Sequence, residues 1–201
     1  MNDLPFERFL RDTRIMRIFE GTNEVLRLFI ALAGMERLGE YLEGVGRALR
    51  EPIQEIGVLT EFAFHRIQDA LGARRSDATV AEPLAGCLRQ VERFTGILHE
   101  SAESLIRTHK DRLVEEQFQL ARAADLAIDV YALVASIGRV QDRIECDGEA
   151  VAGPEIDLVR QFCRDAGARI ERGQALLAGN HDPRVRRIAS EAIAARRGAR
   201  G

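Results

Sequence analysis

Apolar residues recur at steps of three and four positions through almost the whole chain, which is the spacing of one face of an α-helix. The pattern runs through the segments 22–42, 52–71, 84–105, 113–137, 156–170 and 185–193. No segment alternates apolar and polar residues as a half-buried strand does. We therefore expect an all-α fold, arranged as an antiparallel helical bundle.

Glycine, proline and short polar stretches divide this pattern into separate helices. Such breaks lie at Gly72, at 74–77, at 146–148, at Gly153-Pro154 and at 180–183. In the last of them, Asp182 can cap and Pro183 can open a final helix. The break that begins at Gly72 predicts two parts, residues 1–72 and residues 84–197.

Composition and charge exclude several classes of protein. The chain has 201 residues, of which 46% are hydrophobic and 30% charged, so it can bury a core. Its formal net charge of −3 gives no reason to expect nucleic acid as a partner. No apolar stretch approaches the roughly 20 residues that span a bilayer, and the amino terminus lacks the basic start of a secretory signal. We expect a soluble intracellular protein.

Cysteine and histidine usage indicates neither a disulfide framework nor a metal site. The three cysteines, Cys87, Cys146 and Cys163, are far apart, and this odd, sparse set favours a reducing compartment. Cys87 and Cys146 lack the basic, helix-start setting of a nucleophile, and Cys163 is expected to be a small buried hydrophobe. The four histidines are not spaced as ligands on one helix face, so we expect no metal.

The segment around Glu20 has the features of a catalytic carboxylate. Three apolar residues, Ile15, Ile18 and Phe19, precede it. Gly21 then breaks the helix without adding a side chain, and Thr22 begins a new helix whose first N–H groups are free for an acceptor. A carboxylate that an apolar segment brings to such a junction is partly desolvated, which raises its pKa and suits it to act as a base.

Taken alone, Glu-Gly-Thr is most often a helix terminus with its cap, but the longer string is specific. Residues 11–15 read Arg-Asp-Thr-Arg-Ile, and residues 18–25 read Ile-Phe-Glu-Gly-Thr-Asn-Glu-Val, with Arg27 following. Together they resemble the carboxy-terminal signature of acyl-CoA dehydrogenases. The resemblance implies a structural role for Arg11, Asp12 and Arg14, which would hold the approach segment by ion pairs.

For the site itself, the resemblance implies that Glu20 is the base that removes the α-proton of a fatty acyl-CoA. A hydride then passes to the flavin of FAD and leaves a trans-2-enoyl-CoA, in fatty acid β-oxidation. Gly21 matches a position that contacts substrate, and Thr22, Asn23 and Glu24 match the stretch along FAD. An electron-transfer flavoprotein as acceptor and a homodimer are further expectations from the family.

The later segments 108–118 and 125–132 resemble the extra helical domain of very-long-chain acyl-CoA dehydrogenases. On this basis, residues 1–72 are expected to end the family's carboxy-terminal helical domain and residues 84–197 to form the extra tail. Membrane-surface contact through 52–71 is less expected than ordinary packing, because that helix lacks a basic face. The expected compartment is the cytoplasm, or the mitochondrial matrix and inner-membrane surface in a eukaryote.

The family's amino-terminal helical domain and central β-domain, which also contact flavin and acyl-CoA, are not part of this sequence. We therefore expect the chain alone to be inactive and to be a fragment or one chain of a split enzyme. The alternative is a non-catalytic helical module, derived from the same family, that docks a partner or dimerises. In that case the segment around Glu20 is inherited from the family and has no catalytic role.

Overall fold

The computed structural model describes residues 5–19, 21–50 and 79–198, and these ranges contain helices and no strand. The elements are α1 (Phe6–Arg14), η1 (Ile15–Arg17), α2 (Asn23–Arg50), η2 (Glu82–Leu84), α4 (Ala85–His109), η3 (Lys110–Glu115), α5 (Gln117–Asp147), α6 (Glu149–Ala178) and α7 (Asp182–Gly198). The predicted all-α fold is confirmed. The predicted helix 52–71, its end at Gly72 and the polar run 74–77 lie outside the described residues.

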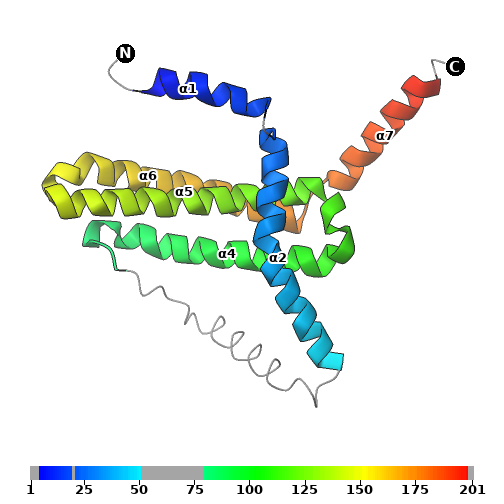
Figure 1. Cartoon of the computed structure of the whole chain (residues 1–201), viewed down its shortest axis with the longest axis horizontal. Coiled ribbons are helices and arrows are strands. Elements are labelled where there is room, and N and C mark those ends of the chain that lie inside the picture. Colours follow the sequence, from blue (N-terminus) through cyan, green and yellow to red (C-terminus); the bar gives the residue numbers. More distant parts are fainter. Residues whose placement is uncertain (1–4, 20, 51–78, 199–201) are drawn as a thin grey trace.

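Helices α4, α5 and α6 lie side by side and antiparallel, and they enclose the main core (Figure 1). The apolar stripes predicted on α4 and α6 face this core. On α5 the prediction is only partly correct, because Ile128 and Tyr131 of the predicted stripe are exposed. The largest side chains that are almost completely shielded from solvent in this core are Leu84, Phe94, Leu126, Leu133 and Ile170. Burying each such side chain contributes about 1.5–3 kcal/mol, so this three-helix layer is the stable part of the described chain.

Helix α2 crosses α4 and α5 and forms a second, smaller apolar cluster with them (Figure 1). Ala31 and Met35 are its buried residues on α2. The predicted stripe on this helix is only partly correct, because Val25 and Phe29 are exposed. Periodicity identifies an apolar face, but the bundle covers only the part of that face near Met35. Helix α2 also continues to Arg50, beyond the predicted end at residue 42.

A close approach between α6 and α4 depends on a glycine. A Cβ atom at Gly167 would lie 2.9 Å from Cζ of Phe94, a side chain that is almost completely buried. Real Cβ atoms essentially never come so close to another heavy atom. Gly167 therefore allows the Phe94 ring to pack directly against the backbone of α6.

The break predicted at Gly153-Pro154 is wrong, whereas the break predicted at 180–183 is confirmed. Gly153-Pro154 does not interrupt a helix, because α6 begins at Glu149 and includes Pro154 in its second turn. The one backbone hydrogen bond that proline removes is offset by burial of Ala152 and Ile156 on either side. Asp182 does begin the last helix, but its carboxylate oxygens accept hydrogen bonds from Arg122 rather than from the first turn of α7.

The two terminal helices stand apart from this bundle (Figure 1). No residue of α1 is buried, and the described element against which it mainly packs is η1. Helix α7 is attached through its first turns, where Asp182 binds Arg122 and Arg186 binds Glu116. Within the described ranges, no helix is long and apolar enough to cross a membrane.

Candidate active site

The chain on both sides of Glu20 forms the predicted junction between two helices. Glu20 itself lies outside the described residues. On the amino-terminal side, α1 passes into the short helix η1, and the N–H of Ile18 closes it with a hydrogen bond of 2.9 Å to the carbonyl oxygen of Ile15. On the carboxy-terminal side, α2 begins at Asn23. The junction therefore spans only a few residues centred on Glu20.

Gly21 has a positive φ of 89°, a conformation that residues with a side chain rarely adopt. A Cβ atom there would make an ordinary contact of 3.5 Å with Cδ2 of Leu26, so space does not require the glycine. Instead, it is the positive φ of Gly21 that favours a residue without a side chain. The prediction that Gly21 breaks the helix is confirmed, and the residue next to the candidate base leaves its surroundings free of a side chain.

Thr22 caps the start of α2. Its hydroxyl oxygen accepts the N–H of Val25 at 3.5 Å, and its carbonyl oxygen accepts the N–H of Leu26 at 2.9 Å. Thr22 is half-buried, as is Asn23. The prediction that a new helix starts here is confirmed, and its amino-terminal end, with the positive end of the helix dipole, follows directly after Gly21.

Glu24 is exposed in the first turn of α2. Its own backbone N–H and the Thr22 hydroxyl hydrogen bond to the carboxylate and hold its pKa below the usual value. A negative charge at this place also interacts favourably with the start of the helix. Glu24 is therefore ionised at neutral pH and acts as an acceptor, not as a proton donor.

Arg27 fixes the start of α2 against the bundle. Its Nε donates to Oδ1 of Asp125 on α5 at 2.6 Å, and its Nη1 donates to the carbonyl oxygen of Asn23 at 3.3 Å. One guanidinium group thus holds both the first turn of α2 and the central helix α5. The partner Asp125 was missed by the sequence analysis, because nothing in the sequence links positions 98 residues apart.

The apolar approach to Glu20 is open to solvent in this chain. The exposed fraction is 53% for Ile15, 78% for Ile18 and 47% for Phe19. Helix α1 adds further exposed apolar side chains, as does the outer face of α2. We define this surface as the α1–α2 apolar face, formed by Phe6, Phe9, Leu10, Ile15, Met16, Ile18, Phe19, Val25, Leu26 and Phe29. The expected desolvating surroundings of Glu20 are therefore not supplied by these flanking residues.

The ion pairs expected around the approach segment are present but local. Asp12 lies 3.7 Å from Arg8, and Arg11 pairs with Glu7 at 2.5 Å, each within α1 and fully in solvent. Exposed pairs of this kind contribute at most about 1 kcal/mol. They lie within α1 and do not join it to the bundle, so the predicted role of Arg11, Asp12 and Arg14 in holding the approach segment stays a prediction.

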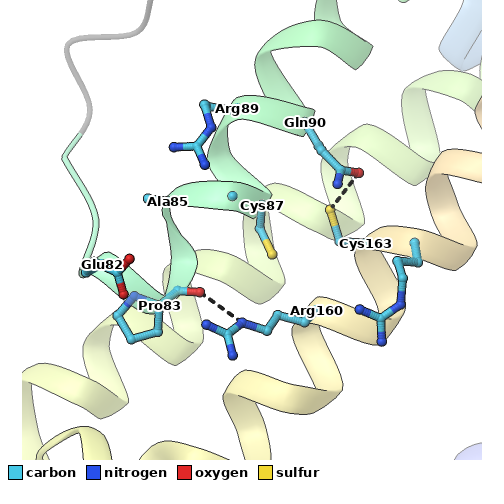
Figure 2. Close-up of a pocket in the computed structure, with 10 residues that line it drawn as sticks. Glu82, Pro83, Ala85, Cys87, Arg89, Gln90, Arg160 and Cys163 are labelled. Carbon is cyan, nitrogen blue, oxygen red and sulfur yellow. Dashed lines mark hydrogen bonds between the residues drawn. The ribbon is translucent and has the colours of Figure 1, made fainter.

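Two pockets lie away from the junction. The first, about 290 Å³, lies where α2 crosses α4 and α5 and is almost wholly apolar. The second, about 340 Å³, lies between the start of α4 and the middle of α6 (Figure 2). Three arginines line it together with Cys87 and Cys163.

The second pocket corrects the expectation for Cys87. This residue lies in the first turn of α4 and shares the pocket with Arg89 and Arg160, so its setting is both basic and at a helix start. Cys163 is buried as expected. The sequence could not predict that Cys87 and Cys163 share a pocket, because they lie on two helices that come together only in the folded chain. Among the described residues, no group of three or more histidine, cysteine or acidic side chains could hold a metal ion.

Comparison with known proteins agrees with the predicted resemblance. Residues 82–197 match the family ACAD9/ACADV, C-terminal domain, and residues 1–35 match the family Acyl-CoA dehydrogenase, C-terminal domain. The chain is 38% identical over 184 residues to the very long-chain specific acyl-CoA dehydrogenase, mitochondrial, of Homo sapiens, covering 88% of this chain and 27% of that protein. The same enzyme of Rattus norvegicus is 35% identical over 187 residues, covering 90% of this chain and 28% of that protein.

A solved structure gives the same result. The acyl-CoA dehydrogenase from Bacillus anthracis, complexed with FAD, matches with a TM-score of 0.57 and 26% identity, over 88% of this chain and 27% of that one. The helical fold and the junction at Glu20 thus define a carboxy-terminal region of the acyl-CoA dehydrogenases. More closely, the chain belongs to the ACAD9/ACADV C-terminal domain family. It spans just over a quarter of the length of the relatives named here.

Proposed function

We propose that this chain provides the carboxy-terminal helices of an FAD-dependent acyl-CoA dehydrogenase and that Glu20 is its catalytic base. The observation that carries the proposal is the junction in which Gly21, at positive φ, leads into the Thr22-capped start of α2. In this arrangement the residue that follows Glu20 in the sequence contributes no side chain, which supports close approach of a substrate. Glu20 then takes a proton from the carbon next to the thioester carbonyl of a fatty acyl-CoA, and the product is a trans-2-enoyl-CoA.

The residues after Gly21 fit a cofactor rich in hydrogen-bond acceptors. Thr22 and Asn23 are half-buried polar residues at the positive end of a helix, directly after Gly21 in the sequence. In the proposal, Thr22, Asn23 and Glu24 lie along FAD and Gly21 contacts the substrate. When bound, FAD supplies the hydride acceptor that no side chain can provide. Arg27 holds the first turn in position through the Asn23 carbonyl oxygen.

We further propose that residues 1–72 complete the family's carboxy-terminal helical domain and that residues 84–197 form the extra tail. The two matched ranges, 1–35 and 82–197, support this division. The α1–α2 apolar face supports an origin in a larger enzyme, because an exposed apolar surface of this size marks an interface. Electron-transfer flavoprotein as acceptor, a homodimer and a mitochondrial or cytoplasmic location remain predictions from the family.

The decisive experiment compares two carboxylates in an enzyme that contains this chain together with the flavin-binding domains. Glu20→Gln is expected to slow flavin reduction by an acyl-CoA about 10²–10⁴-fold, while the affinity for acyl-CoA stays nearly unchanged. Glu36→Gln, an exposed acid further along α2, is the matched control and is expected to reduce flavin at the normal rate. Flavin reduction at a comparable rate in both variants would show that another group is the base.

A second candidate function is a non-catalytic module that docks a partner or dimerises. The α1–α2 apolar face favours it for the chain in isolation, because no residue of α1 is buried. The purified chain is then expected to be colourless and to self-associate or bind a partner through this face. Phe9→Ser with Phe29→Ser should abolish that association. A yellow, stoichiometric FAD complex of the chain alone would contradict this second function.

A further inference from the structure

Cys87 and Cys163 meet at the second pocket, on facing sides of α4 and α6 (Figure 2). Both cysteines line this pocket, and the Cys163 thiol donates a hydrogen bond of 3.5 Å to Oε1 of Gln90. Burial and the neighbouring Cys87 raise the pKa of Cys163 to about 12. The two cysteines are therefore neighbours at one pocket, and Cys163 is held as a protonated thiol at neutral pH.

The pocket gives a small molecule access to this pair. Both cysteines line the cavity of about 340 Å³, and the residues before Cys87 are the small Ala85 and Gly86, which also line it. Cys87 has the larger exposed fraction, 5% against 1% for Cys163. Cys87 is therefore the more accessible of the two residues, and we expect an incoming reagent to react first with its sulfur.

The charge of the pocket selects the reagent. Arg89, Arg160 and Arg164 line it, and Glu82 is the one acidic residue among its lining side chains. Arg160 is held in place by a hydrogen bond of 3.1 Å from its Nε to the Pro83 carbonyl oxygen (Figure 2). This positive pocket lies on a protein whose net charge is −3, so an anionic molecule is drawn here rather than to the rest of the surface.

We propose that Cys87 and Cys163 form a dithiol site that an anionic, low-molecular-weight disulfide converts to a disulfide bond between α4 and α6. The Cys87 sulfur, after losing its proton to solvent, attacks one sulfur of the reagent and releases the other half as a thiol. Cys163 then loses its proton, attacks the Cys87 sulfur and releases the second half as a thiol. Two protein thiols are oxidised and one disulfide is reduced to two thiols, so electrons and protons balance.

The order of these two steps can be recognised from the intermediate that forms first. Attack requires the thiolate, and the raised pKa of Cys163 makes its ionisation rare near neutrality. The second step is therefore the slow one. A mixed disulfide at Cys87 forms first and is then replaced by the bond between the two cysteines.

Oxidised glutathione is the probe, applied to the native chain with Cys146→Ser as background, because Cys146 is an exposed thiol that would react separately. Intact mass is expected to rise by one glutathionyl group and then to fall to two hydrogens below the starting mass. Peptide mapping should find Cys87 linked to Cys163. In Cys163→Ala the glutathionyl adduct at Cys87 should persist. Absence of both adduct and link in the folded protein, with reaction only in denaturant, would show that the pair is simply packed core.

The charge of the reagent is tested separately. Arg89→Gln with Arg164→Gln is expected to slow the reaction with oxidised glutathione about tenfold or more. The reaction with cystamine, a cationic disulfide, should not slow. Arg184→Gln with Arg197→Gln, two arginines on α7, is the matched control and should leave both rates unchanged. Equal rates for the pocket variant and the control would overturn the assignment of an anionic reagent.

Discussion

The guanidinium of Arg27 lies 2.6 Å from the carboxylate of Asp125, and this ion pair joins the helix that follows Glu20 to the central helix of the bundle. Arg27 also binds the carbonyl oxygen of Asn23 in the first turn of α2. Asp125 belongs to a segment characteristic of the very-long-chain type, while Arg27 belongs to the general signature. The pair is therefore a direct contact between the proposed active site and the proposed tail.

This contact predicts a coupled effect of two substitutions. Arg27 and Asp125 are partly exposed, with 35% and 56% of their side chains accessible, so Asp125→Asn should lower the free energy of unfolding by about 1 kcal/mol or less. Arg27→Gln should cost a similar amount, and the double variant little more than either one. Chemical denaturation of the four proteins measures this. Asp12→Asn, which breaks the exposed Arg8 pair, is the control and should have no measurable effect.

The stability of the double variant shows whether Arg27 and Asp125 interact in solution or only lie close together. If the two single effects add fully in the double variant, Arg27 and Asp125 do not interact in solution. In the complete enzyme, a loss of flavin reduction in Asp125→Asn without loss of stability would indicate that the pair positions the first turn of α2.

Gly21 predicts a local effect with little change in overall stability. Gly21→Ala would put an alanine at φ 89°, at a cost of about 1–2 kcal/mol. Because no residue of α1 is buried, the strain can be relieved by a change in the direction of α1 relative to α2. We therefore expect the melting temperature of the chain to change little and the rate of flavin reduction in the complete enzyme to fall.

The control for Gly21 is a glycine without a positive φ. Gly39, within α2, has open space around the position of a Cβ atom. Gly39→Ala should leave flavin reduction unchanged and should stabilise α2 by about 0.5–1 kcal/mol, because alanine favours a helix. A similar fall in flavin reduction for both variants would argue against a special role of the backbone at Gly21.

The sequence predicted the helices, the junction at Gly21 and the family, because these depend on local order along the chain. Periodicity identified Phe94 and Ile137 as core residues, and both are buried, but it also placed the exposed Tyr131 in the apolar stripe. It could not tell that Phe29 is exposed, since that depends on which surface covers the helix. Periodicity could not predict the pairs Arg27–Asp125 and Cys87–Cys163 for the same reason, because each pair comes together only when helices distant in the sequence pack.

The close approach of Phe94 to Gly167 predicts that even a methyl side chain at position 167 lowers the free energy of unfolding. Gly167→Ala would bring a Cβ atom to 2.9 Å from Phe94 Cζ, and the buried ring has little room to move. We expect a decrease of about 1–3 kcal/mol in the free energy of unfolding. Phe94→Leu should restore part of this loss in the Gly167→Ala background. Gly153→Ala, where a Cβ atom meets nothing, is the control and should be neutral or stabilising.

The attachment of α7 predicts a dependence on pH. Two nitrogens of Arg122 donate to the Asp182 carboxylate at 2.6 and 2.7 Å, and this hydrogen bonding holds the pKa of Asp182 below its usual value of 3.8. Because the folded pKa is the lower one, the stabilisation is complete above about pH 4 and is lost as the pH falls through the folded value. Glu116, paired with Arg186, has its pKa lowered in the same way and acts in the same direction.

We therefore expect Asp182→Asn to destabilise the docking of α7 by about 1–2 kcal/mol at neutral pH and by progressively less below about pH 4. Protease susceptibility of α7, followed from neutral pH to about pH 3, measures this, because an undocked helix is cleaved faster. Asp157→Asn, whose carboxylate is 81% exposed and 3.8 Å from Arg160, is the control and should match the unchanged chain. A difference between Asp182→Asn and the unchanged chain that stays constant down to pH 3 would mean that the carboxylate charge does not hold α7.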